Sequence, residues 1–320
     1  MSEIKIMSYN IENMRNLFFN NQFNQDSIEK VNSLEKTITN QQPHILGIVE
    51  ASDKINHHQY FIDNTKLSDL GYKVGKSDYK RGRQELIVYY REPFEIITVD
   101  ENIKYYETWA EDIDQDGIEE VCEFEKKPLE VLFRRKGTDI TFLVILVATK
   151  SKGVFSINDI VNHQYLALAN RKKLLAQSKK IRCRLDQLMD EQPKLPLIVM
   201  GDFNDEPGMD SYEKLLGASS IETVMGSVFE TDKILHNTMW HLTKTDRKND
   251  LWTTEYPDLI VQNFGLHKAW LDHIFVSQNL LTESAKFKYV MNSGEIIPKD
   301  ADAKNVSDHY AVYCKFKVSN

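Results

Sequence analysis

Eight short apolar runs, most of them rich in β-branched residues, constrain the fold of this chain more than any other feature. Several lack the alternation of apolar and polar residues that marks a strand with one solvated face. Continuous apolar runs of this length are typical of strands buried on both faces. The expected strands are Ile4–Tyr9, Ile45–Val49, Leu86–Tyr90, Val131–Phe133, Ile140–Val147, Leu197–Met200, Leu271–Val276 and Ala311–Val318.

Helical patterns lie between these strands. One stripe at helical spacing, with Asp26 or Ser27 as its N-cap, consists of Ile28, Val31, Leu34, Glu35 and Ile38. The longest expected helix runs from about Ile157 to Met189. Because strands and helices mix along the whole length, the sequence predicts a single α/β domain over residues 1–320, with an acidic excursion at about 100–125.

The charge balance and the cysteine content narrow the functional classes. The chain has 40 Lys plus Arg against 48 Asp plus Glu, a net charge of −8, which disfavours binding of nucleic acid by bulk positive charge. A net negative charge does not disfavour an enzyme that binds phosphate through a metal ion. Three cysteines without paired spacing favour a reducing compartment. Residues 1–5 show no secretion signal and the longest apolar stretch, Phe142–Ala148, is too short to cross a bilayer, so we expect a cytoplasmic protein without stable membrane insertion.

The most informative segment is Pro196–Asp205, in which a buried strand ends in Gly-Asp-Phe-Asn. Asp202 and Asn204 follow the strand two residues apart, at the carboxyl end where α/β proteins build their sites. The carboxylate can orient or deprotonate water, and the neutral amide can donate to a phosphate oxygen without repelling it. A polar turn that merely caps the strand is the alternative for this segment taken alone.

Four other segments place polar residues at strand ends. Asn10 closes the first strand, and Glu50 closes an apolar strand where its charge is costly unless solvated, paired or bound to metal. Asp272 opens a late strand. Asp308 and His309 open the last one, which sets a carboxylate that can bind a metal beside an imidazole poised near neutral pH.

In their order along the chain, these five segments resemble the endonuclease/exonuclease/phosphatase superfamily, whose best-known members are the pancreatic-type deoxyribonucleases. The resemblance runs from about residue 4 to 317 and is most specific in Gly201–Asn204 and Ser307–His309. It implies a four-layer sandwich, in which two mixed β-sheets pack face to face with helices on the outside.

The resemblance also implies roles for the site residues. A divalent metal, usually Mg²⁺ or else Mn²⁺, would be held by Glu50 with help from Asn10 and Asp308. Asp202 would orient the attacking water and Asn204 would hold the phosphate. His309, backed by Asp272, would contact the phosphate or act as a base.

The sequence departs from the family at one place. Many members carry Asn-His-Leu-Lys-Ser at the end of a central strand, and here Ala148 stands where the second catalytic His is expected. The partner carboxylate of that His would fall near Gln84 or Glu85, and Gln84 is the closer match. Three explanations stay open. Lys150 or Thr149 serves the leaving oxygen, the leaving group needs no acid, or the chain binds without catalysing.

A separate motif lies in the acidic excursion. Asp112, Asp114 and Asp116, followed by Gly117 and by Glu123 at position 12, fit the template of a Ca²⁺ loop. A solvated acidic loop is the alternative, because Glu119 replaces the usual apolar residue and the flanks are not helical.

Two surface features complete the sequence picture. A basic cluster near the expected edge of the site could track a phosphodiester backbone, and it consists of Lys73, Lys76, Lys80, Arg81 and Arg83. The pair His57-His58 is expected on the surface.

These features together predict a divalent-metal-dependent phosphodiesterase, an endonuclease or exonuclease with DNA or RNA as its expected substrate. A phosphatase or phospholipase that acts on lipid or inositol phosphoesters is one alternative. A catalytically silent binding module of the same fold is the other, and Ala148 supports it.

Overall fold

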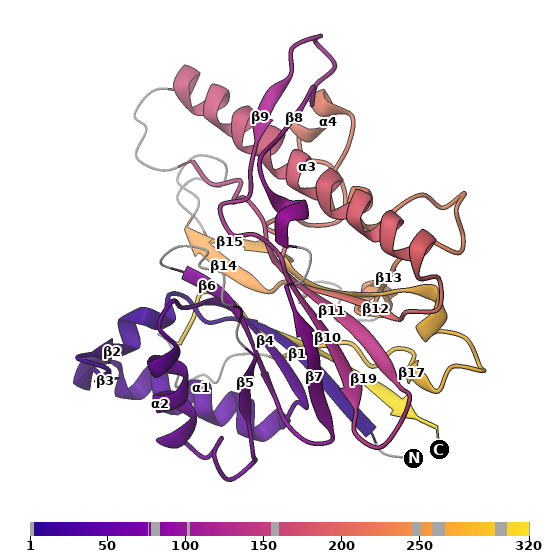
Figure 1. The fold of residues 1–320 in the computed structure, drawn as a ribbon. Helices are drawn as coiled ribbons and strands as arrows, with labels where there is room; N and C mark the ends of the chain where they lie inside the picture. Colours follow the sequence, from indigo (N-terminus) through magenta and orange to yellow (C-terminus); the bar gives the residue numbers. More distant parts are fainter. Residues whose placement is uncertain are drawn as a thin grey trace.

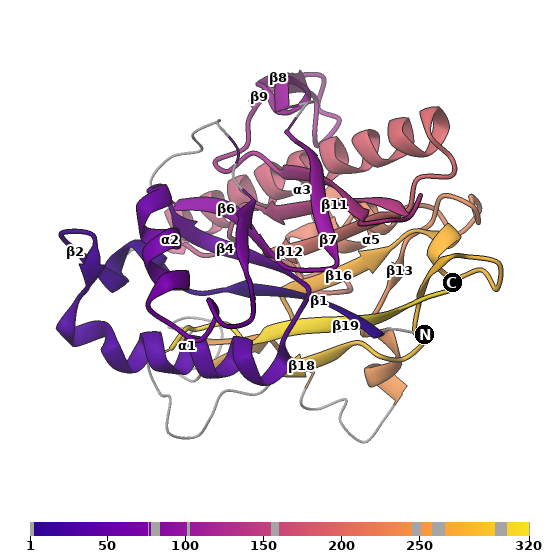
Figure 2. The same cartoon turned by 60° about the horizontal axis from the view of Figure 1, so that its bottom comes forward.

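Two β-sheets lie face to face in the computed structural model of the chain, with helices on their outer sides (Figures 1 and 2). The structure describes residues 3–75, 77, 84–100, 103–154, 160–244, 251–257, 266–297 and 306–319. Within these residues the larger sheet has seven strands, in the order β17 (Phe287–Tyr289), β19 (Ala311–Val318), β1 (Glu3–Asn10), β4 (Ile45–Ser52), β6 (Gln84–Tyr90) and β5 (Lys73–Gly75), with β18 (Glu295–Ile297) also paired to β19. The smaller sheet has six, in the order β13 (His236–Asn237), β16 (Asp272–Val276), β12 (Leu197–Asp202), β11 (Thr141–Ala148), β10 (Leu129–Arg135) and β7 (Phe94–Val99).

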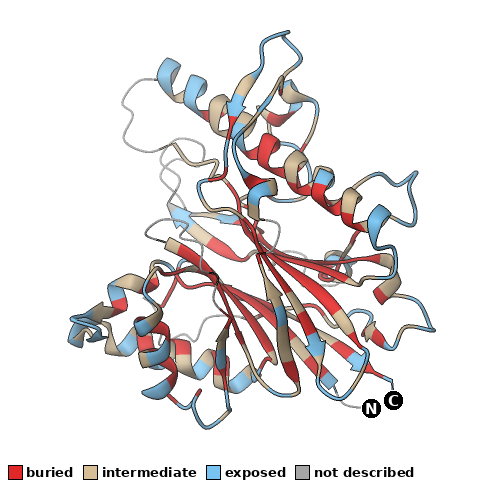
Figure 3. Ribbon diagram, in the orientation of Figure 1, coloured by how far each residue is buried: buried red, intermediate tan, exposed pale blue. Residues whose placement is uncertain are grey.

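Side chains alternate across the strands, and this alternation separates an inner core from two outer ones. On β11, Val144 and Leu146 point into the core between the sheets, whereas Ile145 and Val147 point to the outer face. Helices α3 (Ile160–Glu191) and α5 (Ser220–Met225) cover that outer face, and α1 (Ile28–Gln41) and α2 (Ile55–Asp63) cover the outer face of the larger sheet. Figure 3 shows the buried residues concentrated along the two sheets. The predicted four-layer sandwich of two mixed sheets is therefore confirmed.

The expected elements agree closely with the observed ones. All eight predicted strands are present, with ends displaced by a few residues at most. The long helix is confirmed as α3, although its expected start at Ile157 lies outside the described residues. Ser27 precedes α1 as predicted, but its side chain makes no capping hydrogen bond.

Shorter elements decorate this frame. Within the described residues, three two-stranded antiparallel sheets are formed by β2 (Phe18–Phe19) with β3 (Gln22–Phe23), β8 (Trp109–Glu111) with β9 (Glu120–Cys122), and β14 (Thr254–Pro257) with β15 (Leu266–Ala269). Helix α4 (Glu213–Leu216) is a single turn, and the 3-10 turns are η1 (Met14–Leu17), η2 (Gln25–Ser27), η3 (Ile103–Tyr106), η4 (Trp240–Lys244) and η6 (Gln278–Leu280). In the part of the chain that the structure describes, no helix has the length and apolarity needed to span a bilayer.

The prediction that His57 and His58 lie on the surface is wrong. Both lie on α2 and are buried. The ring Nε2 of His58 donates to the Ser52 carbonyl oxygen (2.8 Å), so its Nδ1 accepts from the Tyr89 hydroxyl (2.8 Å). The His57 ring stacks on Phe18. Two adjacent histidines in a sequence suggest an exposed site. In the fold, α2 instead places His58 against β4 and β6 and places His57 against the β2–β3 hairpin.

The topology brings the five polar strand ends to one edge of the sandwich. Strands β1 and β4 run parallel, as do β11 and β12, so Asn10, Glu50 and Asp202 lie at carboxyl ends. Strand β16 is antiparallel to β12, with Asp272 opposite Asp202, and β19 is antiparallel to β1. The starts of β16 and β19 therefore lie at the same edge as the ends of β1 and β12.

Gly201 is required where β12 reaches this edge. Its φ of +141° is a backbone conformation that residues with a side chain rarely adopt, and a Cβ there would lie 2.0 Å from the Val147 carbonyl oxygen. The obstacle is backbone, so no rotamer change can relieve it.

We expect Gly201→Ala to lower the free energy of unfolding by about 3 kcal/mol or more, because strain and a backbone clash combine. Urea unfolding followed by circular dichroism measures the effect. Gly137→Asn is the matched control, since Gly137 has φ +71° in an open turn where Asn is tolerated. An unchanged midpoint for Gly201→Ala would show that β12 does not approach β11 as described.

Candidate functional site

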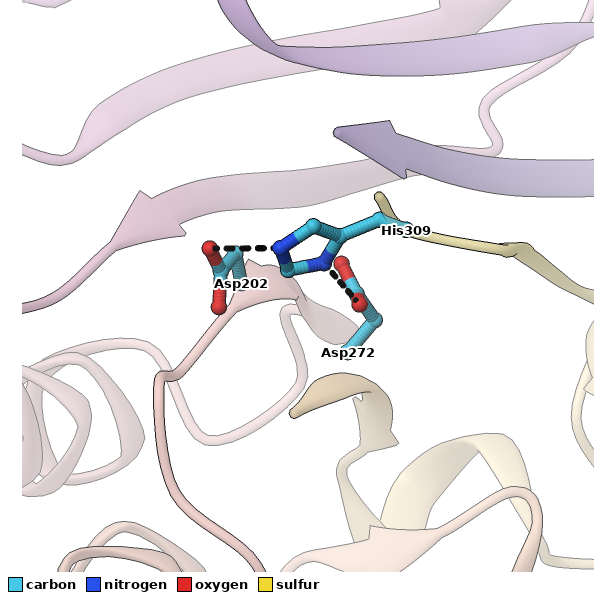
Figure 4. A group of neighbouring side chains, drawn as sticks. All are labelled: Asp202, Asp272 and His309. Carbon is cyan, nitrogen blue, oxygen red and sulfur yellow. Dashed lines mark hydrogen bonds and ion pairs between the residues drawn. The ribbon is translucent and has the colours of Figure 1, made fainter. Parts of the chain in front are cut away.

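A buried imidazole between two buried carboxylates forms the centre of the site (Figure 4). His309 Nδ1 lies 2.7 Å from Asp272 Oδ2, and His309 Nε2 lies 3.9 Å from Asp202 Oδ2. Asp308, which is half exposed, also lies 3.9 Å from His309 Nε2. The structure thus brings together Asp202, Asp272, Asp308 and His309, as the sequence predicted.

These neighbours shift the pKa values of the central groups. Burial disfavours the charged imidazole, but Asp272 and Asp202 outweigh it and raise the pKa of His309 to about 10. Burial raises the pKa of Asp202 to about 6, against the lowering effect of the His309 cation and with a further increase from Asp272. Near neutral pH the site therefore holds a cationic imidazole beside a carboxylate that is only just ionised.

Asn10 and Ser307 connect this centre to the larger sheet. Asn10 Nδ2 donates to Asp202 Oδ2 (3.1 Å), a buried contact between residues of the two sheets. The Ser307 hydroxyl donates to the Asn10 carbonyl oxygen (2.7 Å) and accepts from the His309 backbone N–H (3.0 Å). Ser307 therefore fixes the first turn of the Ser-Asp-His segment against the end of β1.

Asn204 is held in a left-handed conformation, with φ of 50°. Its backbone N–H donates to Asp202 Oδ1 (2.9 Å) and its side-chain Nδ2 donates to the Thr149 carbonyl oxygen (3.0 Å). The amide group predicted to hold phosphate is thereby fixed beside the carboxylate predicted to orient water.

Glu50 is directed into the site by a β-bulge. The pairing of β4 with β6 shifts register between Ile48 and Ala51, and Glu50 has φ of 58°. Its Oε2 accepts from the Asn13 backbone N–H (3.0 Å) and from Gln84 Nε2 (2.8 Å). Gln84, expected beside the missing His, is therefore a partner of Glu50.

The residues at this edge fit a hard divalent cation. Within the described residues, Asp272 Oδ1 is buried without a hydrogen-bond partner. The other atoms here that could ligate a metal are mainly carboxylate and amide oxygens, which hard divalent cations prefer. Asp202, Asp272 and His309 could chelate one ion, but the 2.7 Å hydrogen bond already commits Asp272 to His309. That Glu50 holds the cation with help from Asn10 and Asp308 stays a prediction, and Asn10 Oδ1 accepts from the Glu12 backbone N–H (3.1 Å).

The position of the missing imidazole holds only a methyl group. Ala148 is the register partner of Asp202. The Thr149 hydroxyl donates to the Phe203 carbonyl oxygen, and Lys150 Nζ donates to Glu125 Oε1 (2.8 Å). Both groups suggested as substitutes are therefore engaged elsewhere.

Lys126 is a cation of the site that the sequence analysis missed. Its Nζ lies 3.9 Å from Glu50 Oε1. Lys126 lies three residues before Leu129, where β10 of the smaller sheet begins, whereas Glu50 lies on β4 of the larger sheet. The signal available in the sequence was the pair Lys126-Lys127 just before an expected strand, but only the packing of the two sheets brings Lys126 to Glu50.

Asp205 anchors the segment that carries Asn204. Its Oδ2 accepts from the Ser220 backbone N–H (2.9 Å) at the start of α5, and its Oδ1 pairs with Lys152 Nζ. Lys152 also pairs with Glu213 Oε1 (2.8 Å). This buried group of charges supports the catalytic turn from behind, and no sequence motif marked it.

The acidic loop gathers only part of its predicted ligands. Asp112, Asp114 and Asp116 come close enough to share one cation. Lys172 of α3 already pairs with Asp114, and it lies 2.8 Å from Glu120 Oε1. Glu123 lies past the end of β9, is exposed and is outside this group, because the loop closes a β-hairpin rather than joining two helices.

The predicted basic cluster is only partly described. Lys73 begins β5 and is exposed. Lys76, Lys80, Arg81 and Arg83 lie outside the described residues.

Comparisons with solved structures show what this sandwich and site resemble. TDP2 from Caenorhabditis elegans matches with a TM-score of 0.58 and 14% identity, over 98% of this chain and 75% of that chain. The human Nocturnin catalytic domain with bound sulfate matches at 0.54 and 16%, over 99% and 95%. An endonuclease/exonuclease/phosphatase from Bacteroides vulgatus matches at 0.56 and 14%, over 100% of both chains. At these identities the matches show the fold alone.

The fold and site define a phosphoesterase sandwich with a buried acidic and histidine cluster at one edge. A model of the endonuclease/exonuclease/phosphatase family matches residues 16–315. The chain therefore belongs to the endonuclease/exonuclease/phosphatase family, whose members are metal-dependent phosphoesterases. A comparison with curated proteins found no match.

Replacing Asp272 by Asn should lower the pKa of His309 from about 10, because burial then acts against Asp202 and Asp308 without the largest opposing charge. The raised pKa stabilises the folded protein fully below pH 6.5, and that stabilisation is lost as the pH rises towards 10. Asp272→Asn should therefore also flatten the loss of stability over this range. NMR titration of the His309 ring protons gives the pKa directly.

Asp139→Asn serves as the control for this titration, since Asp139 is exposed and lies between β10 and β11 at the opposite edge. An unchanged His309 pKa in Asp272→Asn would mean that the buried ion pair does not form.

Removing charge at Glu50 and at Lys126 should change metal affinity in opposite directions. Glu50→Gln should weaken Mn²⁺ binding, because a neutral amide replaces the carboxylate. Lys126→Gln should tighten it several-fold, because a cation about 4 Å from Glu50 competes with the metal. Isothermal titration calorimetry without substrate measures both.

Lys150→Gln is the matched control, because Lys150 is held by Glu125 rather than Glu50. Equal effects of Lys126→Gln and Lys150→Gln, or no effect of Glu50→Gln, would place the metal elsewhere.

Proposed function

We propose that the protein is a divalent-metal-dependent nuclease that hydrolyses phosphodiester bonds of DNA or RNA by attack of water. The observation that carries the proposal is the cluster of Asp202, Asp272 and His309, with Asn10 bonded to Asp202, in a chain of this family. A zebrafish relative, D. rerio TDP2, forms a complex with a single-strand DNA product at 14% identity to this chain, which supports nucleic acid as the substrate class.

The residues divide the chemistry between them. Asp202 orients the attacking water and accepts hydrogen bonds from it, and its ionised form is the competent one. Asn204 donates to a phosphate oxygen without adding charge. His309, kept cationic by Asp272, stabilises the charge that develops on the phosphoryl oxygens. Glu50 would hold a divalent cation, Mg²⁺ or Mn²⁺ in this proposal, which would supply Lewis acidity towards the phosphate.

Asp202→Asn should reduce phosphodiester hydrolysis by about 10²–10⁴-fold, since it removes the group that activates water. The assay is a panel of single-stranded DNA, duplex DNA, RNA and phosphoinositide headgroups, each with Mg²⁺, with Mn²⁺ and with chelator. Asp139→Asn is the matched control on the opposite edge. Hydrolysis that survives both Asp202→Asn and chelator would refute the proposal. Hydrolysis of headgroups alone would favour a phosphatase or phospholipase.

One observation favours a second candidate, a binding module without catalysis. Ala148 faces Asp202, and neither Thr149 nor Lys150 replaces the missing imidazole there. We expect Ala148→His to raise the rate of an already active protein by less than the about 10²–10⁴-fold that a well-placed general acid contributes. The reason is that Gln84, where the partner carboxylate is expected, binds Glu50 and would not orient the new imidazole. Activity that appears only in Ala148→His, with none in the wild type, would instead support the binding module.

We also propose that the protein works in the cytoplasm, on the grounds of its three unpaired cysteines, of which Cys183 is exposed. Recovery of the native protein outside the cell would contradict this.

A further inference from the structure

The β2–β3 hairpin is fixed in place beside the site edge. Its two turn residues, Asn20 and Asn21, both have positive φ (50° and 63°), the conformation that a tight two-residue hairpin requires. Phe18 stacks on the His57 ring with centroids 4.0 Å apart, and Phe23 meets Tyr60 edge-on at 5.0 Å. These rings hold the hairpin against α2.

The hairpin presents one aromatic ring to solvent. Phe18 and Phe19 are adjacent on β2, so their side chains point to opposite faces. Phe18 packs inward, and Phe19 is 70% exposed. A large ring held outward on an anchored hairpin is a rigid stacking surface.

A hollow of about 470 Å³ lies between this hairpin, η1 and the start of α2. The residues that line it include two cationic ones, Arg15 and Lys54, and three with aromatic rings, Phe18, Phe19 and His57. The remaining lining is amide-rich, with Asn16, Asn20, Asn21 and Asn24.

The hollow continues from the catalytic edge. The Asn13 backbone N–H donates to Glu50 Oε2, and η1 begins at the next residue. Lys54 follows Glu50 by four residues, just past the end of β4. Arg15 Nη1 lies 3.6 Å from Asp53 Oδ1, so this side chain spans from η1 to the segment after β4. A nucleic-acid strand bound at Glu50 would therefore reach the hollow if it extended along this edge of the sandwich.

We propose that this hollow binds an unpaired nucleotide of a single-stranded nucleic acid, beside the bond that the site cuts; the inference rests on the proposed nuclease function. The chemistry of the lining carries it. An exposed ring can stack on a base, amide side chains match the donors and acceptors of base edges, and Arg15 and Lys54 can contact the backbone phosphates. A lipid or inositol headgroup would use the cations but offers no flat ring to Phe19. A duplex keeps its bases stacked, so Phe19 selects a single strand.

The test is binding without cleavage. In an Asp202→Asn background, fluorescence anisotropy of a short labelled single strand gives Kd for the otherwise unaltered protein and for Phe19→Ala. We expect Phe19→Ala to raise Kd about tenfold or more, and Phe19→Trp to retain tight binding. Phe229→Ala is the matched control, since Phe229 is 93% exposed and lies between α5 and β13, away from the hollow. Arg15→Gln should reduce the salt dependence of binding.

The outcomes separate this inference from the proposed function. Single-strand binding that is insensitive to Phe19→Ala, or equal binding of a duplex, overturns the hollow as a subsite but leaves hydrolysis untouched. Phosphoinositide vesicles that bind through Phe19 while single strands do not bind also overturn it. A third outcome is that single strands bind through Phe19 while the wild-type protein hydrolyses no substrate in the panel. That result would support the hollow as a nucleotide subsite and refute the proposed nuclease function. Circular dichroism of each variant excludes misfolding as the cause.

Discussion

The site joins the two sheets through buried hydrogen bonds, one between Asn10 and Asp202 and another between His309 and Asp272. Asn10 ends β1 in the larger sheet, Asp202 ends β12 in the smaller one, and the Asn10 amide donates to the Asp202 carboxylate in the buried interior of this edge. Sheets packed through apolar side chains alone can slide, because dispersion and hydrophobic contacts have little direction. A buried amide that must find its acceptor fixes the offset between them. Every other distance in the site depends on that offset, since His309 and Asp272 come from strands paired to β1 and β12.

The electrostatics of the centre follow from this packing. A buried imidazole would ordinarily be neutral, yet two carboxylates within 3.9 Å keep His309 charged. The chain as a whole carries −8, so its surface does not attract phosphate. At the site edge, the described residues nevertheless include the cations His309, Lys126 and Arg15. Ala148 stands where the family's second imidazole is expected, so that position adds no further positive charge.

The fold and the strand-end residues could be predicted from the sequence because their signals are local. Asp202 and Glu50 stand directly at the ends of apolar runs, and a strand end needs no knowledge of its neighbours. The other residues depend on contacts between distant segments. Gln84 reaches Glu50 across a β-bulge, and Lys126 reaches it through the packing of the two sheets. The burial of His57 and His58 also depends on partners, Phe18 and Tyr89, that lie 39 and 31 residues away. No pattern within a short window encodes such pairings.

The order in which the site's residues occur along the chain has a consequence for synthesis. The Ser307 hydroxyl donates to the Asn10 carbonyl oxygen, 297 residues away in the sequence, so the segments at β1 and β19 both contribute to the site. A ribosome releases the amino-terminal residues long before it adds His309. The site therefore cannot form until β19 is being added to the chain, because His309 lies two residues before that strand.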